Sequence, residues 1–148
     1  MRVYLAAAMT TPNRALGVVR ALLEALESRG HRVLTAHVAD PQGKQHDAQL
    51  SDDELARRDL AWLNQASCLV AEVSTPSHGV GAEVMAACQL GKPVLLLAQE
   101  AAPVSRFLLG LPGVKFVRYR EPAQATSAVL LFMESLAGNQ REDHLASQ

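Results

Sequence analysis

Runs of apolar residues alternate along this chain with segments in which apolar residues recur at helical spacing. Residues 2–8 are apolar almost throughout, which is typical of a strand covered on both faces in a parallel sheet. A stripe of leucines and valines follows and ends at Gly30, as expected for an amphipathic helix. The same pattern predicts four more strands, at residues 31–36, 67–73, 93–97 and 114–118.

Helices are predicted between these strands. Ser51, followed three residues later by Glu54, indicates a capping box and a helix that runs to about residue 64. Later helices are expected at residues 81–90 and 123–136, with a short one inside the loop 99–110. Residues 38–50 have no clear period, so we expect a loop there that can move over a site.

Strands that alternate with helices predict an α/β fold with a single doubly wound parallel sheet. We expect five strands in flavodoxin-like (Rossmann-like) order, with helices on both faces. A length of 148 residues fits one domain, which we place at residues 1–137. Residues 138–148 are polar, and we expect them to form a disordered tail.

Composition narrows the class of protein. The formal net charge is −1 and aromatic residues make up 4% of the chain, which argues against a nucleic-acid partner. Cys68 and Cys88 lie in apolar surroundings without metal-ligand spacing and are expected to be buried free thiols, as in a reducing cytoplasm. The apolar N-terminal run is too short for a signal peptide, and no run reaches membrane-spanning length.

The candidate chemistry lies after the third strand. Residues 74–81 form a loop of glycine and small polar residues that leads into a helix, where free N–H groups favour an anion. Glu83 is expected just inside this helix, where the helix dipole lowers the pKa of a carboxylate that can act as a nucleophile. A dinucleotide-binding GxGxxG motif is excluded because Val84 replaces its third glycine. Phosphate-binding GxxxxGK[ST] and catalytic GxSxG motifs are absent from the sequence.

Three carboxylates remain as candidates: Asp59 near a helix end, Glu72 at the end of the third strand, and Glu83. Two of them could converge on one site. A pair of carboxylates suits cleavage of a glycosidic bond, in which one group attacks or stabilises the anomeric carbon and the other handles protons.

The segment from Asp59 to Glu83 resembles the 2'-deoxynucleoside 5'-phosphate N-hydrolases, which belong to the nucleoside 2-deoxyribosyltransferase-like superfamily. The resemblance rests on Asp59-Leu60-Ala61-Trp62-Leu63, Ala66, Val70-Ala71-Glu72-Val73-Ser74, Pro76-Ser77, Gly79-Val80-Gly81 and Glu83, which follow the family's spacing without gaps. Tyr4, Leu34-Thr35-Ala36-His37-Val38 and Ser105 extend it over most of the chain.

This resemblance implies roles for individual residues. Glu83 would be the nucleophile that forms a covalent 2-deoxyribosyl intermediate at C1', and Asp59 would orient the sugar and transfer protons. Tyr4 would lie at the sugar or the base. Ser77 and the N–H groups of Gly79 and Gly81 would hold the 5'-phosphate, together with Ser105 of the partner subunit in a homodimer.

The sequence departs from the family after the first strand. Ala7-Ala8 replaces the usual Gly-Ser pair, and Thr10 stands where the family has a phosphate-contacting arginine. Arg14 is the alternative phosphate ligand. The resemblance implies no metal and no redox cofactor.

Each candidate also has a plain structural interpretation. Glu83 could be a solvated residue of the first helical turn, and Asp59 could pair with Arg57 or Arg58 at the surface. A strand-end residue that binds loop backbone is the favoured interpretation of Glu72. Packing, loop or capping roles are expected for Ser77, His37, His78 and Trp62.

The leading function is an N-glycosidase that hydrolyses the base–sugar bond of a (2'-deoxy)nucleoside 5'-monophosphate. One alternative is a nucleoside 2-deoxyribosyltransferase, in which a second base captures the intermediate in place of water. The other is a nucleotide-binding sensor without turnover.

Overall fold

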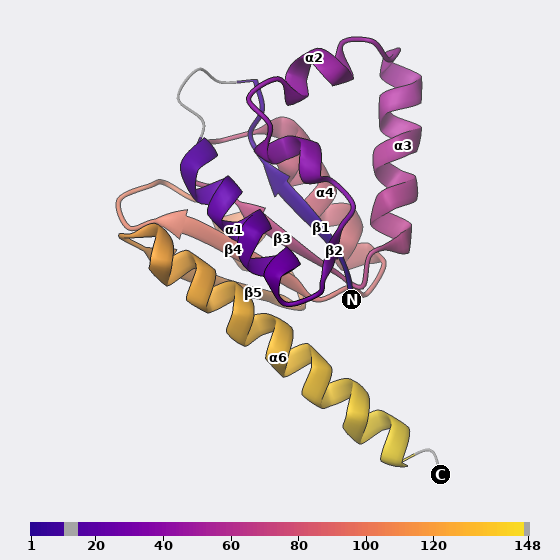
Figure 1. The fold of residues 1–148 in the computed structure, drawn as a ribbon, viewed down its shortest axis with the longest axis vertical. Coiled ribbons are helices and arrows are strands. Elements are labelled where there is room, and N and C mark those ends of the chain that lie inside the picture. The colour runs from indigo at the N-terminus through magenta and orange to yellow at the C-terminus, as the bar shows by residue number, and fades with distance from the viewer. Residues whose placement is uncertain (11–14, 147–148) are drawn as a thin grey trace.

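A five-stranded parallel sheet forms the centre of the protein, as the computed structural model of residues 1–10 and 15–146 shows (Figure 1). All neighbouring strands are parallel, and their order is β2-β1-β3-β4-β5. This is the flavodoxin-like order that the alternating pattern predicts, so the expected fold class is confirmed. The strands are β1 (Arg2–Ala7), β2 (Arg32–Val33), β3 (Cys68–Glu72), β4 (Val94–Gln99) and β5 (Val114–Tyr119).

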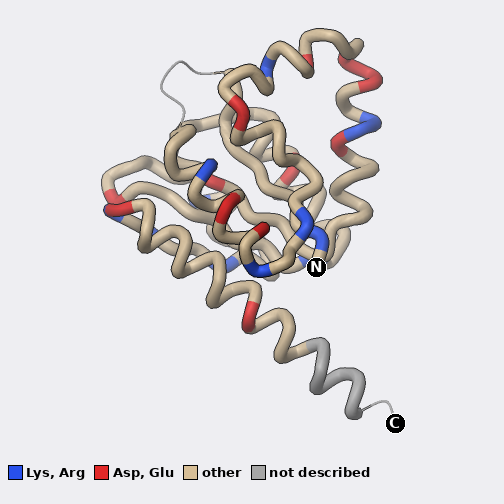
Figure 2. Tube along the Cα trace, viewed as in Figure 1, with Lys and Arg blue, Asp and Glu red and all other residues tan. Residues whose placement is uncertain are grey.

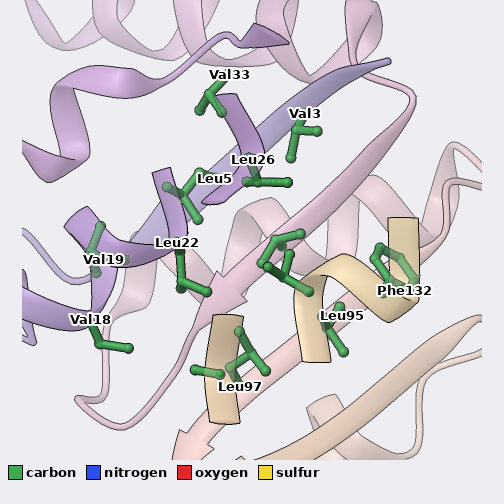
Figure 3. Close-up of a cluster of buried hydrophobic side chains, with 14 of the residues drawn as sticks. Val3, Leu5, Val18, Val19, Leu22, Leu26, Val33, Leu95, Leu97 and Phe132 are labelled. Atoms are coloured by element: carbon green, nitrogen blue, oxygen red, sulfur yellow. The ribbon is translucent and has the colours of Figure 1, made fainter. Parts of the chain in front are cut away.

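Helices cover both faces of this sheet. On one face, α1 (Leu16–Ser28) and α6 (Pro122–Ala146) pack over alternate residues of β1, β3 and β4, and Figure 3 shows part of this core. The other face carries α3 (Asp52–Gln65), α4 (His78–Gln89) and the short α5 (Arg106–Leu109). Because β1, β3 and β4 are covered on both faces, they are apolar at nearly every position, which made them predictable.

The second strand is much shorter than predicted. β2 contains only Arg32 and Val33, at the edge of the sheet beside β1. At the next step along β1, a side chain replaces the backbone hydrogen bonds between the two strands. The hydroxyl of Thr35 donates to the carbonyl of Leu5 at 2.6 Å and accepts from the N–H of Leu5 at 2.9 Å. The backbone then turns away from the sheet, so the strand predicted at residues 31–36 ends early.

The segment 38–50, predicted to be a loop, contains regular structure. A 3-10 helix, η1 (Ala36–Ala39), precedes α2 (Gly43–Asp47). η1 packs beside β1, and α2 lies beyond it at the top of Figure 1. Both are only about one turn long, and one turn shows no helical period in the sequence. The capping box that begins α3 is confirmed, with reciprocal hydrogen bonds between Ser51 and Glu54.

At the C-terminus, α6 continues to Ala146, ten residues beyond the end predicted at residue 136 and into the segment predicted as a tail. Gly138 costs a helix only about 1 kcal/mol relative to alanine, and most residues after it are compatible with a helix. Cys68 is buried and Cys88 is half-buried, and both are free thiols. Figure 2 shows basic and acidic residues interspersed along the chain. None of the helices described combines the length and apolar character needed to cross a bilayer.

Candidate active site

A cavity of about 510 Å³ opens where the connections of the sheet change direction, between β1 and β3. Crevices at this position of doubly wound sheets commonly bind ligands, and the volume lies in the range of small-molecule pockets. Five structural units contribute to its wall: the end of β1 with the residues that follow it, the segment from β2 to α2, α3, the loop before α4, and the first two turns of α4. Among the predicted site residues, those that line it are Tyr4, Thr10, Asp59, Ser77, Gly79 and Glu83.

Glu83 and Tyr4 form a bonded pair in this cavity. The Tyr4 hydroxyl donates to Oε1 of Glu83 at 2.8 Å, and the Tyr4 side chain is almost fully buried. Burial raises the pKa of Glu83 to about 7; the nearby Asp59 carboxylate acts in the same direction, while the Tyr4 hydrogen bond opposes it. Burial and the Glu83 carboxylate likewise raise the pKa of Tyr4, which remains a hydrogen-bond donor.

This result corrects two expectations about Glu83. Since α4 begins at His78, Glu83 lies in the second helical turn and not at the helix start, where a dipole acts most strongly. Its pKa is therefore raised by burial, whereas the sequence predicted a lowered value. The structural alternative of a solvated first-turn residue is also wrong, because Glu83 is only partly exposed and is bonded to Tyr4.

Asp59 reaches the same cavity from α3. Arg58 holds it through two contacts to Oδ1, from Nη2 at 2.8 Å and from Nε at 2.9 Å. This confirms the predicted pairing with a neighbouring arginine, but the carboxylate is 20% exposed and faces the cavity. Asp59 and Glu83 therefore share one site, as the idea of a carboxylate pair requires.

The N-terminus of α4 forms another part of the wall. Ser77 is the N-cap residue, and its Oγ accepts from the N–H of Val80 at 3.4 Å, which confirms the capping interpretation. Gly81 is not in a loop: its N–H donates to the carbonyl of Ser77 at 3.1 Å within the helix. The N–H groups of His78 and Gly79 precede the helical ladder and have no partner inside the helix.

Two other predicted phosphate ligands lie elsewhere. Ser105 and Gly81 line a second pocket of about 400 Å³, which adjoins the first at the start of α4. The two pockets share four residues: Pro76, Ser77, His78 and Val80. Arg14 lies outside the described residues, so its predicted role has no structural counterpart here.

The structure adds residues that the sequence interpretation left out of the site. Asp47, the last residue of α2, lines the cavity. Its Oδ1 forms an ion pair with Nη1 of Arg58 at 2.8 Å. His37 also lines it, lies 3.7 Å from Asp47, and packs against Trp62 at a ring-centroid distance of 5.6 Å. Burial lowers the pKa of His37. Only the paired charges on α3 could have suggested this cluster, because no periodicity marks Asp47.

Glu72 has the structural role that was favoured for it. It is 2% exposed, and its Oε1 accepts from the hydroxyl of Tyr119 at 2.9 Å and from the N–H of Ser74 at 3.3 Å. The hydroxyl of Ser74 donates to the same oxygen. Glu72 does not line the cavity of Glu83. Within the described residues, no cluster of three or more histidine, cysteine or acidic side chains is arranged to hold a metal ion.

Comparison with known proteins identifies the family of this chain. The family model of nucleoside 2-deoxyribosyltransferases matches residues 3–143. A protein of Thermofilum pendens whose name assigns it to the 2'-deoxynucleoside 5'-phosphate N-hydrolases is 43% identical over 118 residues, covering 78% of this chain and 82% of the relative. The chain belongs to the nucleoside 2-deoxyribosyltransferase family. The family resemblance seen in the sequence is thereby confirmed.

One further relative bears on the activity, and one solved structure bears on the fold. The mouse 5-hydroxymethyl-dUMP N-hydrolase is 51% identical over 70 residues, which are 45% of this chain and 39% of the mouse protein. The structure of the Clostridium botulinum CMP N-glycosidase BcmB superposes with a TM-score of 0.67 at 23% identity, covering 89% of this chain and 99% of that one, and shows the shared fold. Together with the family, the named relatives confirm the expectation of an N-glycosidase.

Proposed function

We propose that this protein hydrolyses the N-glycosidic bond of a (2'-deoxy)nucleoside 5'-monophosphate and releases the free base and (deoxy)ribose 5-phosphate. The observation that carries the proposal is Glu83: a mostly buried carboxylate that lines the cavity together with Asp59 and is bonded through Oε1 to Tyr4. Relatives of this protein are named for the same reaction, on 2'-deoxynucleoside 5'-phosphates and on 5-hydroxymethyl-dUMP.

The proposed first step is attack of Glu83 on C1' of the sugar. Because Oε1 accepts from Tyr4, Oε2 is the oxygen available to form the ester bond. The bond between C1' and the base nitrogen breaks, and its electron pair leaves with the base, which takes up a proton delivered by Asp59 or by water. The transition state has oxocarbenium character, which neighbouring carboxylates stabilise.

In the second step, water attacks C1' and the ester to Glu83 breaks, which returns the carboxylate. The proton released by this water passes to Asp59. Glu83 must be ionised to attack, and the Tyr4 hydrogen bond and the nearby Arg58 charge favour its ionised form.

The 5'-phosphate is assigned to the N-terminus of α4. Ser77 and Gly79 line the cavity there, and the first N–H groups of a helix together with its dipole favour an anion. Thr10, in place of the expected arginine, also lines the cavity and is the second side-chain hydroxyl assigned to the phosphate. These donors offset the charge that the phosphate brings near Glu83.

The proposal includes a homodimer in which Ser105 of the partner subunit completes the phosphate site. Ser105 lies outside the cavity of Glu83 in its own chain, and Phe107 beside it is 67% exposed, which suits a face covered by a second copy. Sedimentation of the protein together with a raised KM in Ser105→Ala tests this part. A monomer with full activity would rule it out.

The activity is tested by incubating the protein with nucleosides and 5'-monophosphates, in ribo and deoxyribo form and including 5-hydroxymethyl-dUMP, and measuring base release by chromatography. Glu83→Gln serves as the control, because it keeps the side chain's shape but cannot attack. Monophosphates are expected to be cleaved and nucleosides to resist. Nucleotide binding without base release would favour the sensor, and exchange with an added free base would favour the transferase.

The covalent step needs its own measurement. Acid quenching during turnover, followed by mass spectrometry of the intact protein, is expected to show one added sugar phosphate in the wild type and none in Glu83→Gln. Base release without any adduct, also with a slowly hydrolysed 2'-fluoro substrate, would argue for direct attack by water.

A further inference from the structure

Arg58 lies behind the cavity and contacts two of the acidic residues that line it. Its Nη1 is 2.8 Å from Asp47 on α2, and its Nη2 is 2.8 Å from Asp59 on α3. The guanidinium also lies 4.6 Å above the ring centroid of Trp62. Only 22% of the Arg58 side chain is exposed, and it is not among the residues that line the cavity. Three contacts in different directions thus fix this side chain in one place.

The neighbouring Arg57 shows how unusual this arrangement is. Its side chain is 73% exposed and pairs at 3.2 Å with Asp53, which is 90% exposed, one turn earlier on the same helix. An exposed pair of this kind contributes little to stability and is screened by salt. The chain therefore contains two adjacent arginines on α3, each paired with aspartate, of which only Arg58 is connected to the cavity.

We propose that Arg58 is a positioning residue for the hydrolysis: it fixes Asp47 and Asp59 at the cavity wall and keeps a positive charge behind the three carboxylates, so that Glu83 remains available as an anion. This inference rests on the proposed function. Arg58 does not touch the reacting atoms and acts through the carboxylates that do.

The charges around Glu83 favour such a role. The groups that face it are Tyr4 from β1, Asp59 and Arg58 from α3, Asp47 from α2, and the two histidines of the cavity wall, His37 and His78. Burial raises the pKa of Glu83, and Asp59 and Asp47 act in the same direction. Arg58 lowers that pKa, and it carries its charge at every working pH. Since burial lowers the pKa of His37, this imidazole is largely neutral at pH 7 and cannot replace Arg58.

Arg58 also determines where α2 lies. This helix has five residues, fewer than an isolated helix needs to be stable. Asp47 connects it to Arg58 on one side and to His37, at 3.7 Å, on the other. Without Arg58, the α2 part of the cavity wall loses its only described ion pair to α3, so substrate should bind more weakly as well.

Three variants separate these effects: Arg58→Gln, Arg58→Lys and, as the matched control, Arg57→Gln. The readouts are the pH dependence of kcat/KM for a cleaved 5'-monophosphate and the pKa of Glu83 from NMR of the side-chain carboxyl. For Arg58→Gln, both the acid limb and the measured pKa are expected to rise by about one pH unit, the low end of the effect of a nearby charge. KM is expected to rise by about tenfold, equivalent to one lost charged hydrogen bond.

The lysine variant distinguishes charge from geometry. Lysine keeps the charge but cannot bridge two carboxylates with a planar fork. The acid limb of Arg58→Lys should therefore stay near that of the wild type while its KM rises as in Arg58→Gln. Arg57→Gln should match the wild type in all readouts, and circular dichroism checks that each variant folds.

An unchanged pKa of Glu83 in a folded Arg58→Gln variant would overturn the inference, as would an equal shift in Arg57→Gln. The NMR titration needs no turnover. If the wild type releases no base, the proposed function fails, and the titration still decides whether Arg58 controls the ionisation of Glu83.

Discussion

The two glutamates on either side of the loop between β3 and α4 have similar partners and different surroundings. Glu72 accepts from Tyr119 of β5 at 2.9 Å, and Glu83 accepts from Tyr4 of β1 at 2.8 Å. Glu72 also receives the N–H and the hydroxyl of Ser74, and it is 2% exposed. Glu83 has the single donor Tyr4 among the described residues and faces a cavity that contains other carboxylates.

The comparison shows that burial alone does not identify a reactive carboxylate. A buried anion whose oxygens receive several donors is stabilised as part of the fold. An anion with few donors, an open approach and like charges nearby is costly to keep ionised, and such costs are commonly found at catalytic sites. By this argument Glu72 holds the loop in place, and Glu83 is the group that can react.

The largest expected effect separates the two glutamates by activity. Glu83→Gln should lower kcat/KM at least about a thousandfold, because removing a nucleophile leaves only binding and electrostatic stabilisation. Glu72→Gln should leave kcat within a small factor of the wild type while lowering stability. Steady-state base release for both variants measures this. Comparable losses of kcat in two folded variants would remove the distinction.

The next effect is a pH dependence of stability that comes from Glu83. Its pKa is about 7 in the folded protein and roughly 4.3 in an unfolded chain, so the native state binds this proton more tightly. Stability from this proton is fully present below the unfolded pKa and is lost as the pH rises to about 7. Between pH 5 and pH 8, the free energy of unfolding of the wild type should fall by about 2–3 kcal/mol relative to Glu83→Gln.

Urea unfolding of both proteins at pH 5 and pH 8 provides the measurement. Glu72→Gln is the comparison variant, since it changes the other tyrosine-bonded glutamate, which lies outside the cavity. If the difference between wild type and Glu83→Gln were the same at both pH values, Glu83 would not have a raised pKa.

More of the sheet than of the site could be predicted from the sequence. The three central strands are covered on both faces, and an unbroken apolar run such as residues 2–8 can hardly be interpreted otherwise. The edge strand β2 was overestimated because a side chain, Thr35, replaces backbone in the ladder. The start of α4 was placed late, because the glycines after Ser77 suggested a loop although Ser77 itself is a good N-cap residue.

Some of the site residues could likewise be predicted from the sequence, and others depend on contacts made only in the folded chain. Glu83 and Asp59 were singled out as candidate carboxylates and Tyr4 through the family resemblance, and the structure brings all three to one cavity. Their assigned roles in the reaction stay predictions. Asp47 and Arg58 were not found as a site, because their contact joins α2 to α3 across the fold and a single sequence does not show such pairs. The raised pKa of Glu83 depends on burial, which is likewise a property of the folded chain.

A smaller effect is expected from the tyrosine that holds Glu72. Tyr119→Phe removes one hydrogen bond to a buried carboxylate, which costs about 2 kcal/mol in the free energy of unfolding. The two donors from Ser74 remain and limit the loss. Thermal or urea unfolding measures this, and kcat should stay at the wild-type value. A loss of activity at unchanged stability would mean that the Glu72 network reaches the reaction.

The smallest effect tests the tyrosine that holds Glu83. Tyr4 lowers the pKa of Glu83 by donating to Oε1, so Tyr4→Phe should raise the acid limb of kcat/KM by about one pH unit. Activity at pH 6 should then fall about tenfold, and much less at pH 9, where Glu83 is ionised in either protein. The control is Tyr119→Phe, whose acid limb should stay in place because its partner Glu72 lies outside the cavity. An equal loss for Tyr4→Phe at both pH values would instead mean that the hydroxyl acts on the substrate directly, as the family resemblance implies for Tyr4, and the two tyrosine–glutamate pairs would then differ in chemistry and not only in ionisation.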